Sequence, residues 1–424
     1  MPRNPCSRWL MVFAALLLAL SLAAAAHPAP LADSVILLIG DGMGPTQITV
    51  AREARGAEPL AMEKTPLSGL VTTNSANSPV TDSAAAATAL ATGHKTNNGM
   101  ISVGPREQRL FTLLEKCQAM YKSTGLVTMD ALHGATPAAF ATHVKERGMA
   151  SDIALQLSRS SLSVMLGFWK DWFLPESAGG KRTDGRDLLS RLRRRGYDVV
   201  FTKETLAQAK GQRLVGLFDD GPQAPTLAEM TKAALERLRS DPDGFFLLVE
   251  GARIDWKGHA NDPAGAVLDT WQFDEAVAAA LECARTRGRT LVVVTADHET
   301  GGMGIADRSR LRLLGNVKAS AEEMAQQLNA DRTNAAAVLG SSAGLPDLTP
   351  AELQQITSAK DAAAAVAAVI SQRAGVTWSA QGHTATPVRV FAFGPEAQRF
   401  VGHMDNTDIP KRIAAILGIT RFPQ

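Results

Sequence analysis

The sequence predicts an α/β fold, a three-layer α/β/α sandwich around a central, mostly parallel sheet, with a helical cap or crown inserted into it. Two observations indicate this class. Short aliphatic and β-branched runs, typical of buried strands, alternate with helix-like sequence along the chain. A long segment before the last such run is helix-like and has no strong strand. Alternating strands and helices favour a parallel sheet covered on both faces, which binds ligands at the carboxyl ends of its strands.

Six runs are expected to form the sheet, and helices are clearest at 227–240 and 271–287. The six runs are 34–40, 124–130, 197–201, 245–251, 290–298 and 388–394. Residues 309–378 carry helix-like stretches and loops but precede the last of these runs. We therefore expect them to be a cap or crown that interrupts a main domain covering residues 27–424.

The first 26 residues have the pattern of a secretory signal peptide. Arg3 and Arg8 precede an apolar run from Trp9 to Leu20, and the small residues up to Ala26 form the expected cleavage site. A retained membrane anchor is the weaker alternative, because the apolar run is short and gives way to alanines. The sequence therefore predicts a periplasmic or secreted protein without a membrane anchor.

The charge balance gives no reason to expect nucleic acid or an anionic membrane as a partner. The formal net charge is +2, and removal of the signal takes away Arg3 and Arg8 but no acidic residue, so the net charge of the exported chain is zero. That chain keeps two cysteines, Cys117 and Cys283. An oxidising compartment allows them to pair, but both lie in helix-like sequence and we expect two buried thiols.

Acidic residues follow three of the expected strands. They are Asp41, Glu250 and Asp297. Each alone could be a turn residue or a helix cap, but three carboxylates at one edge of a sheet repel one another and raise each other's pKa. A bound cation relieves this repulsion, so the sequence indicates a metal site.

Histidines accompany acids in the same parts of the sequence. Asp255 and His259 are four residues apart and would share one face of a helical turn. His298 directly follows Asp297, and His383 stands shortly before the last strand. Mixed imidazole and carboxylate ligands suit zinc, whereas an all-oxygen set suits magnesium.

Asp82 and Ser83 open an alanine-rich helical stretch that Gly93 is expected to end. Taken alone, these two residues are helix caps. The alternative is that Ser83 is a nucleophile at the positive end of the helix dipole, where an anion is stabilised. This segment by itself leaves both interpretations open.

Six motifs, in their order along the chain, resemble those of the alkaline phosphatases, and the resemblance extends over nearly all of the exported chain. They are GDGMG (40–44), TDSAAAATALATG (81–93), ATPAAFATHVKER (135–147), VEGARIDWKGH (249–259), TADHETGG (295–302) and GHT (382–384). The resemblance implies hydrolysis of phosphate monoesters through a phosphoserine intermediate, with two Zn²⁺ ions and one Mg²⁺ ion. The complete set favours the catalytic interpretation of Ser83.

The resemblance also implies roles for individual residues. The first zinc would be held by Asp255, His259 and His383, the second by Asp41, Ser83, Asp297 and His298, and the magnesium by Asp41, Thr136 and Glu250. Ser83 would be the nucleophile, Arg147 would bind two phosphate oxygens, and Asp82 would hold that arginine. Taken alone, Arg147 would be a charge on a helix surface.

Two positions depart from the family pattern. Many relatives have Asp or His near the magnesium, two residues before the position of Thr136, where this chain has Gly134. Either His133 compensates through a one-residue shift, or the magnesium site is looser and filled with water. Trp256 occupies a position near the phosphate that is Lys or His in some relatives and Trp in others. These departures bear on the third metal and the pH optimum, not on the reaction class.

A phosphodiesterase, or another hydrolase with the same two-metal core, is the main alternative, although a diesterase usually lacks the equivalent of Arg147. A sulfatase would need a modifiable residue in its own motif at the nucleophile position. A zinc- or phosphate-binding protein without turnover would need neither Ser83 nor Arg147. The expected partners are small phosphate monoesters, and both a monomer and a homodimer fit the sequence.

Overall fold

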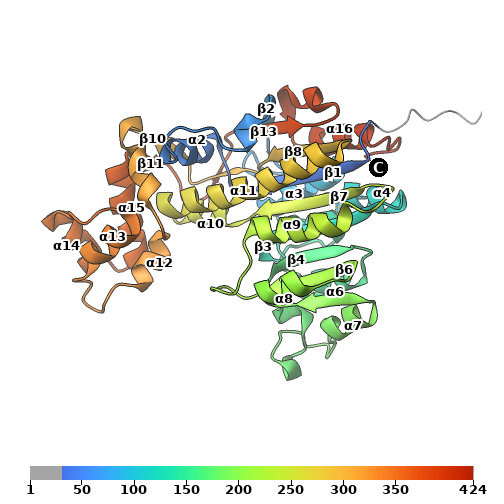
Figure 1. The fold of residues 1–424 in the computed structure, drawn as a ribbon, viewed down its shortest axis with the longest axis horizontal. Coiled ribbons are helices and arrows are strands. Elements are labelled where there is room, and N and C mark those ends of the chain that lie inside the picture. Colours follow the sequence, from blue (N-terminus) through green and yellow to red (C-terminus); the bar gives the residue numbers. More distant parts are fainter. Residues whose placement is uncertain (1–30, 424) are drawn as a thin grey trace, which may run out of the picture.

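A ten-stranded sheet forms the centre of residues 31–423, the part of the chain that this computed structural model describes (Figure 1). The expected signal peptide, residues 1–26, lies outside the described residues. The strands, in the order in which they lie side by side, are β14 (Gly402–Asp405), β2 (Leu67–Thr72), β13 (Val388–Phe393), β8 (Thr290–Thr295), β1 (Ser34–Gly40), β7 (Phe245–Gly251), β3 (Ser123–Ala131), β4 (Val164–Phe168), β6 (Arg213–Phe218) and β5 (Tyr197–Val200).

This sheet is mostly parallel, as predicted. β13 runs antiparallel to both of its neighbours, and the other adjacent pairs in the sheet are parallel. Every residue of β1, β7 and β8 is buried, which is typical of parallel strands covered on both faces. Ile39 of β1 lies beside Glu250 of β7 and beside Thr295 of β8. The three central strands therefore end at one level.

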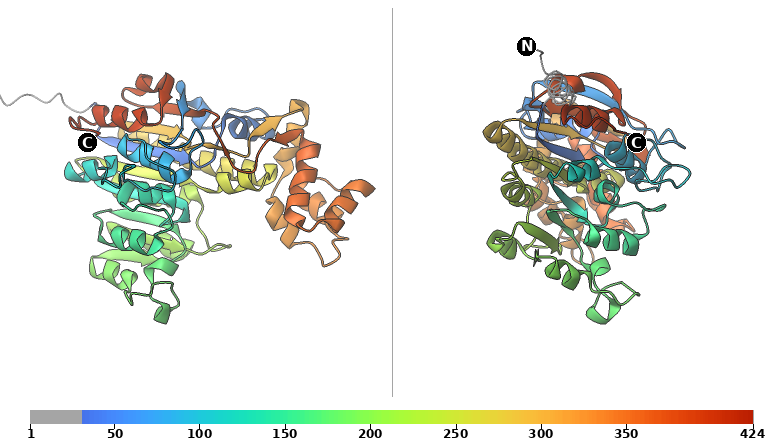
Figure 2. Two further views of the ribbon diagram at one scale, coloured as in Figure 1. Left: turned by 180° about the vertical axis from the view of Figure 1, so that it is seen from behind. Right: turned by 90° about the vertical axis from the view of Figure 1, so that its right-hand side faces the viewer.

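Helices cover both faces of the sheet, which makes the predicted α/β/α arrangement (Figures 1 and 2). One face carries α9 (Leu227–Leu238) and α11 (Pro263–Arg287), and the other carries α3 (Ser83–Thr92), α4 (Leu113–Ala119) and α5 (Ala135–Ala141). A single apolar cluster extends through the three layers. Further helices of this part are α2 (Pro45–Ala54), α6 (Ala150–Arg159), α7 (Leu188–Arg194), α8 (Lys203–Gln208), α10 (Arg253–His259) and α16 (Asp408–Ile416).

Helix α3 begins and ends where the sequence provides caps. Asp82 Oδ1 accepts a hydrogen bond from the Ala85 N–H at 2.9 Å, which satisfies one of the free donors of the first turn. Gly93 ends the helix with φ of 74°, a left-handed conformation that glycine adopts without steric cost. Ser83 is consequently held as the first residue of a well-defined helix.

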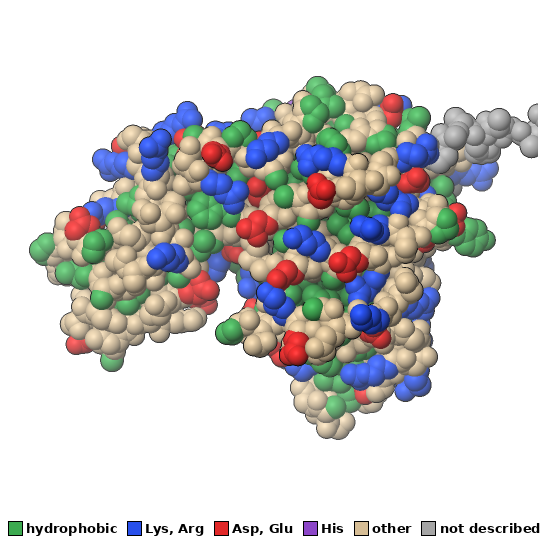
Figure 3. All heavy atoms as spheres, viewed as in Figure 1, with side chains coloured by type: hydrophobic (Ala, Val, Ile, Leu, Met, Phe, Trp, Pro, Cys, Tyr) green, Lys and Arg blue, Asp and Glu red, His purple; other side chains and the backbone are tan. Residues whose placement is uncertain are grey.

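A group of helices stands apart from the sheet at the left of Figure 1. It comprises η4 (Arg308–Asn316), α12 (Ala321–Gln326), α13 (Ala335–Ala343), α14 (Pro350–Ser358) and α15 (Ala362–Ala374). These helices have their own apolar cluster, which also includes the first turns of α11 and two residues of α2. Figure 3 shows the surface hollowed between this group and the lower part of the sheet domain.

Several polar contacts join these helices to the sheet domain, among them Arg308 of η4, which pairs with Glu53 of α2 at 2.7 Å. The Asp262 side chain accepts hydrogen bonds from the Ala264 N–H at the start of α11 and from the Ala321 N–H at the start of α12. Lys257 of α10 lies 3.7 Å from Glu322 of α12. A short strand, β11 (Val376–Trp378), pairs with β10 (Met303–Ile305), in a region where no strong strand was expected.

The six expected strands are present as β1, β3, β5, β7, β8 and β13, and the expected helices correspond to α9 and to the second half of α11. Four strands of the sheet were not predicted: β2, β4, β6 and β14. β2, β4 and β6 each contain a glycine, which weakens the apolar pattern of a strand, and in β14 only Met404 is buried. Their places are decided by neighbouring strands rather than by their own sequence.

Cys117 and Cys283 are buried free thiols, as expected. They lie on α4 and α11, which cover opposite faces of the sheet. Burial raises the pKa of Cys117 to about 12. Within residues 31–423, no helix combines the length and the apolar character that a membrane span requires.

Candidate active site

The carboxyl ends of β1, β7 and β8 bring the three predicted acids to one edge of the sheet. Asp41 follows β1, Glu250 is the penultimate residue of β7, and Asp297 lies two residues beyond β8. Their exposed fractions are 7%, 2% and 0%. The register of β1 with both neighbours sets this arrangement, because it aligns the ends of strands that are more than 200 residues apart in the sequence.

Ser83 lies beside the first group of candidate metal ligands. The ligand atoms of Asp41, Asp297 and His298 lie within 4.8 Å of one another. His298 Nε2 is 3.5 Å from Asp41 Oδ1 and 3.2 Å from Asp297 Oδ2. The same nitrogen is 3.2 Å from Ser83 Oγ. The structure thus brings together the four residues that the sequence assigned to the second zinc.

Asp255, His259 and His383, the residues assigned to the first zinc, also meet. Asp255 and His259 lie one turn apart on α10, with His259 Nε2 3.3 Å from Asp255 Oδ2. His383 Nε2 is 3.5 Å from Asp255 Oδ1 and 3.1 Å from His259 Nε2. The three side chains therefore present ligand atoms to a common point.

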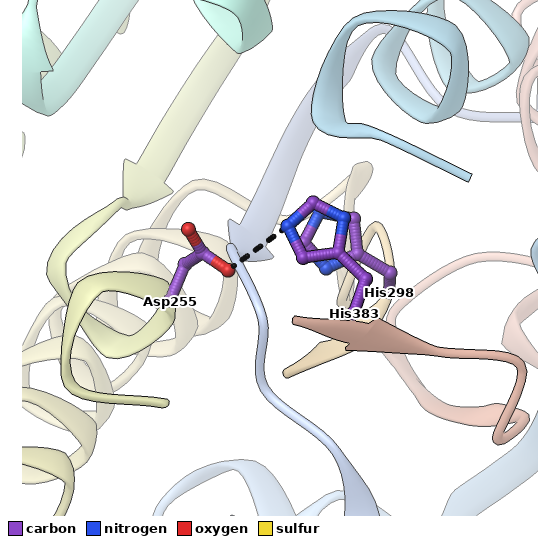
Figure 4. A group of neighbouring side chains, drawn as sticks. All are labelled: Asp255, His298 and His383. Atoms are coloured by element: carbon purple, nitrogen blue, oxygen red, sulfur yellow. Dashed lines mark ion pairs between the residues drawn. The ribbon is translucent and has the colours of Figure 1, made fainter. Parts of the chain in front are cut away.

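The two groups of candidate ligands adjoin one another. Figure 4 shows Asp255, His298 and His383 directed toward one another, and their ligand atoms lie within 4.8 Å. The imidazole rings of His298 and His383 stack with their centroids 3.6 Å apart. A short antiparallel pair, β9 (Glu299–Thr300) and β12 (His383–Thr384), causes this contact because it places His383 opposite Thr300. The site is therefore one continuous cluster of ligands.

Backbone carbonyls orient two of these histidines. Nδ1 of His259 lies 2.6 Å from the Gln381 carbonyl oxygen, and Nδ1 of His383 lies 2.9 Å from the Thr81 carbonyl oxygen. A carbonyl oxygen only accepts, so Nδ1 carries a proton in both rings, and Nε2, the nitrogen that faces Asp255, is the unprotonated one in the neutral imidazole. This is the tautomer that a metal-ligating histidine requires.

Burial and mutual repulsion perturb the acids strongly. Burial, together with the charges of Asp297 and Asp255, raises the pKa of Asp41 well above its usual value. Burial raises the pKa of Asp297 to about 6 and that of Glu250 to about 8. Burial acts in the same direction on Asp255, but its hydrogen bond with His259 and its other contacts outweigh it and hold that pKa at about 2. Asp41, Asp297 and Glu250 are thus buried carboxylates without enough positive charge nearby to stabilise their ionised forms.

Three buried oxygen atoms in this region have no hydrogen-bond partner among the described residues. They are Asp41 Oδ1, Asp297 Oδ2 and Thr136 Oγ1. A buried unpaired oxygen is costly unless a cation coordinates it. Burial also lowers the pKa of His298 to about 4, so this imidazole is neutral at pH 7, as a ligand must be. The residues therefore fit divalent metal ions, with imidazole and carboxylate donors in one part and oxygen donors alone in the other.

Arg147 is held beside Ser83 by Asp82. Asp82 Oδ2 accepts a hydrogen bond from the Gly99 N–H at 3.0 Å and lies 3.4 Å from Arg147 Nη1. Arg147 lies in the loop after α5 rather than on a helix surface, and 45% of its side chain is exposed. A planar guanidinium presented in this way can bind two oxygens of a phosphate group.

Comparison with known proteins identifies the family. The family model for alkaline phosphatase matches residues 32–419. The chain belongs to the alkaline phosphatase family. Members of this family are metal-dependent phosphoric monoester hydrolases, so the expectation drawn from the sequence motifs is confirmed at this level.

Similar proteins come from several bacteria. The chain is 34% identical over 417 residues to alkaline phosphatase 4 of Bacillus subtilis, which covers 91% of this chain and 88% of that protein. The crystal structure of a cold-active alkaline phosphatase from Shewanella has a TM-score of 0.82 and 33% identity, with 91% of this chain and 99% of that chain covered. A variant of the alkaline phosphatase from the Antarctic bacterium TAB5, with Mg bound in its M3 site, has a TM-score of 0.71 and 29% identity, with coverage of 93% and 100%.

In this alkaline phosphatase family member, His133 lies beside Trp172 and not in either group of candidate ligands. The two rings are 6.4 Å apart and meet edge to face. His133 lines a cavity of about 280 Å³ together with Trp169, Asp171, Trp172 and Lys181. Burial lowers the pKa of His133 to about 4. The recorded contacts of this imidazole are thus with the lining of that cavity, and the one-residue shift considered from the sequence stays a prediction.

Trp256 follows Asp255 on α10 but faces a cleft. Its ring stacks on that of Trp169, with centroids 6.0 Å apart and an angle of 11° between the planes. The Arg253 guanidinium lies 5.6 Å from the centre of the Trp256 ring. Arg253 and Trp256 line a cleft of about 880 Å³ together with other residues of α10, α11 and α12, whereas Trp169 lines the cavity next to His133. Trp256 therefore forms an aromatic wall next to a candidate metal ligand.

Two residues of the site, Thr300 and Asp130, were not predicted from the sequence. Thr300 Oγ1 donates a hydrogen bond to Asp255 Oδ1 and lies 3.2 Å from His298 Nδ1, so it orients both ligand groups. Asp130 lies at the end of β3, and its charge contributes to the raised pKa of Glu250. The sequence could have indicated Asp130, because this acid stands at the end of an apolar run, as Asp41 and Glu250 do.

Proposed function

We propose that this chain is an exported alkaline phosphatase that hydrolyses phosphate monoesters through a phosphoserine intermediate at Ser83. The position of Ser83 Oγ, 3.2 Å from His298 Nε2 at the start of α3, supports this most directly. It places a hydroxyl beside a group of metal-ligating side chains and at the positive end of a helix dipole. A binding protein without turnover requires no such hydroxyl.

Two zinc ions and one magnesium ion are the proposed cofactors. The donor chemistry supports Asp255, His259 and His383 as ligands of the first zinc, and Asp41, Ser83, Asp297 and His298 as ligands of the second. Asp41, Thr136 and Glu250 are proposed to hold magnesium, because all three offer oxygen atoms and two of those atoms are unpaired. When bound, these cations would stabilise the negative charge that develops on the attacking and leaving oxygens.

The residues of the chain would act in two steps. Ser83 Oγ loses its proton to solvent and attacks phosphorus, an Oγ–P bond forms, the P–O bond to the leaving group breaks, and the leaving oxygen takes up a proton from solvent to become an alcohol. Water then attacks the phosphoserine, the Oγ–P bond breaks, and Ser83 regains its proton as inorganic phosphate leaves. Arg147, held by Asp82, would donate two N–H groups to the phosphate oxygens in both steps.

The location and the cap are further parts of the proposal. The sequence pattern of residues 1–26 supports cleavage after Ala26 and a periplasmic or secreted enzyme. The separate apolar cluster of the cap helices supports an insertion at about 309–378 within a catalytic domain covering 27–424. The position of the cap beside the cleft near Trp256 gives it a place to contact the leaving group.

Rates with three kinds of ester test the reaction class. Purified protein loaded with zinc and magnesium is expected to hydrolyse an aryl phosphate monoester at least a hundredfold faster than the matching diester or sulfate monoester. The reason is that Arg147 and the α3 N-terminus favour a dianionic group with several unesterified oxygens, whereas a diester and a sulfate monoester each carry a single negative charge. A diester or sulfate that is hydrolysed as fast as the monoester would favour the alternative hydrolases of the same core.

Replacing Arg147 with alanine is expected to lower kcat/KM for a monoester by about ten- to a hundredfold and to weaken inhibition by inorganic phosphate similarly. The Arg147 side chain is 45% exposed, so water replaces part of the lost contact, and the net loss is that of about one charge-assisted hydrogen bond, roughly 1.5–3 kcal/mol. Steady-state kinetics with phosphate as a competitive inhibitor measure both effects. The matched control is Arg147→Lys, which keeps the charge but not the planar pair of donors, and should recover only part of the loss. Unchanged phosphate inhibition in Arg147→Ala would contradict the assignment.

A further inference from the structure

The magnesium site proposed above lacks a side chain at position 134, but the space there is filled. A Cβ atom added to Gly134 would lie 2.6 Å from Asp130 Oδ2 and 2.9 Å from the Ala131 carbonyl oxygen. Both distances are shorter than nonbonded atoms tolerate. The Asp130 carboxylate therefore occupies the place where a side chain at position 134 would begin.

Asp130 and Glu250 are positioned by the same threonine. Thr128 Oγ1 donates a hydrogen bond to Glu250 Oε2 and accepts one from the Asp130 N–H at 2.9 Å. The pairing of β3 with β4 is irregular between Val127 and Ala131, which releases Asp130 from the regular ladder. Asp130 Oδ1 then accepts a hydrogen bond from the Ala131 N–H at 2.6 Å. The other oxygen, Oδ2, faces Gly134.

The positive side chains near Asp130 are engaged with other acids. Arg147 and Arg253 both act on its charge, but Arg147 pairs with Asp82 and Arg253 pairs with Asp220. Burial raises the pKa of Asp130, as it does that of Glu250. Buried carboxylates without a cationic partner are costly, and a bound cation removes that cost.

A buried hydroxyl lies beside the same acid, Glu250. The Thr136 side chain has 1% exposure, and its contact with Glu250 lowers the pKa of that acid, but no hydrogen bond of ordinary geometry from the described residues satisfies Thr136 Oγ1. Thr136 lies two residues after Gly134, at the start of α5. The Thr136 hydroxyl is neutral, so it can coordinate a cation but does not balance the charge of that cation. An oxygen-only site of this kind suits magnesium, which keeps waters that nearby carboxylates can hold.

We propose that Asp130 supplies to the magnesium site the carboxylate that position 134 lacks in this chain. The proposal rests on the proposed function, because it takes the magnesium site as given and adds a residue to it. Asp130 is a positioning residue for the cation and its waters, and it lies outside the two groups of zinc ligands. We do not assign this role to His133, because its ring lies against Trp172.

Magnesium binding to zinc-loaded protein tests the proposal without relying on activity. Asp130→Asn keeps the shape and removes the charge. We expect it to weaken the magnesium Kd, measured by calorimetry, by roughly ten- to a hundredfold, the usual cost of losing such a partner. Zinc content by elemental analysis and the Tm of the zinc-loaded protein are expected to match the wild type. A magnesium Kd equal to that of the wild type overturns the proposal.

A charge-relocation variant separates this role from a structural one. Asp130→Ala combined with Gly134→Asp clears the 2.6 Å contact and moves the carboxylate to position 134. The 2.9 Å contact with the Ala131 carbonyl oxygen remains and has to relax, so we expect the magnesium Kd to be at least severalfold tighter than that of Asp130→Asn rather than fully restored. A Kd no tighter than that of Asp130→Asn, in a variant whose zinc-loaded Tm matches the wild type, overturns the proposal. The control is Asp219→Asn, which removes an exposed acid paired with Lys170 and should leave magnesium binding unchanged. A wild-type protein that bound neither zinc nor magnesium would contradict the proposed function itself.

Discussion

Replacing Ser83 with alanine is expected to lower phosphate monoester turnover by roughly a thousandfold or more, while the fold and the metal content stay intact. The hydroxyl forms the bond to phosphorus in the proposed reaction, and its removal leaves no oxygen at that point. The cost to stability is small, because Asp82 caps α3 and alanine is the residue most favoured inside a helix. The measurements are kcat, zinc content and Tm of the same preparation.

A trapping experiment shows whether the step that Ser83→Ala removes forms a covalent phosphoserine. Wild-type protein quenched with acid during turnover of a labelled monoester should carry the label on Ser83, and Ser83→Ala should carry none. The control is Ser160→Ala, which removes a hydroxyl that donates only to a backbone carbonyl at the end of α6. Wild-type turnover in Ser83→Ala would refute the assignment of the nucleophile.

Removing the metal ions is expected to abolish monoesterase activity and to make the remaining stability depend on pH in a defined direction. In the metal-free protein, burial raises the pKa of Asp297 to about 6 and that of Glu250 to about 8. The unfolded values are about 3.9 and 4.3. Between these values the folded chain binds more protons than the unfolded chain, so the free energy of unfolding falls as the pH rises. This contribution is fully present below about pH 4 and is lost by about pH 8.

Thermal unfolding after exhaustive chelation measures this effect. Below about pH 6.5 the lowered pKa values of His298 and His133 act in the opposite direction, so the test range is pH 7 to pH 9, where Glu250 still titrates and these histidines are neutral in both states. The Tm of the metal-free protein is expected to fall over this range, and zinc with magnesium should restore both the Tm and the activity. Glu250→Gln is the matched control, because glutamine keeps the shape of the side chain and cannot titrate, so its metal-free form should depend less on pH. Activity that survives chelation, or a metal-free Tm that rises over this range, would count against the metal site.

The candidate metal ligands could be predicted where residues close together in the sequence determine their relative positions. Asp255 and His259 are four residues apart, and a helical turn is enough to place them on one face. Asp41 follows a fully apolar run, and that run alone predicts its position at the carboxyl end of a central strand. Asp297 and His298 are adjacent in the sequence, and the non-strand backbone after β8 lets both side chains face the same site.

Other parts of the site could not be predicted in the same way. Gly134 is visible in the sequence, but the position of the Asp130 carboxylate beside it also depends on the irregular pairing of β3 with β4, which no local sequence pattern indicates. His133 and Gly134 are adjacent, yet the imidazole turns toward Trp172. Side-chain direction at such a bend depends on which surfaces are already occupied, so spacing alone does not determine it.

The sequence by itself determined the alternation of strands and helices, the caps of α3 and the chemical nature of the donors, because these depend on residues within a few positions of one another. The tertiary structure decided which donors share a cation. β1 aligns with β7 and β8, and β12 pairs with β9, so Asp41, Glu250, His298 and His383 meet across gaps of up to several hundred residues. Long-range strand register sets those distances, and packing of the whole core fixes that register.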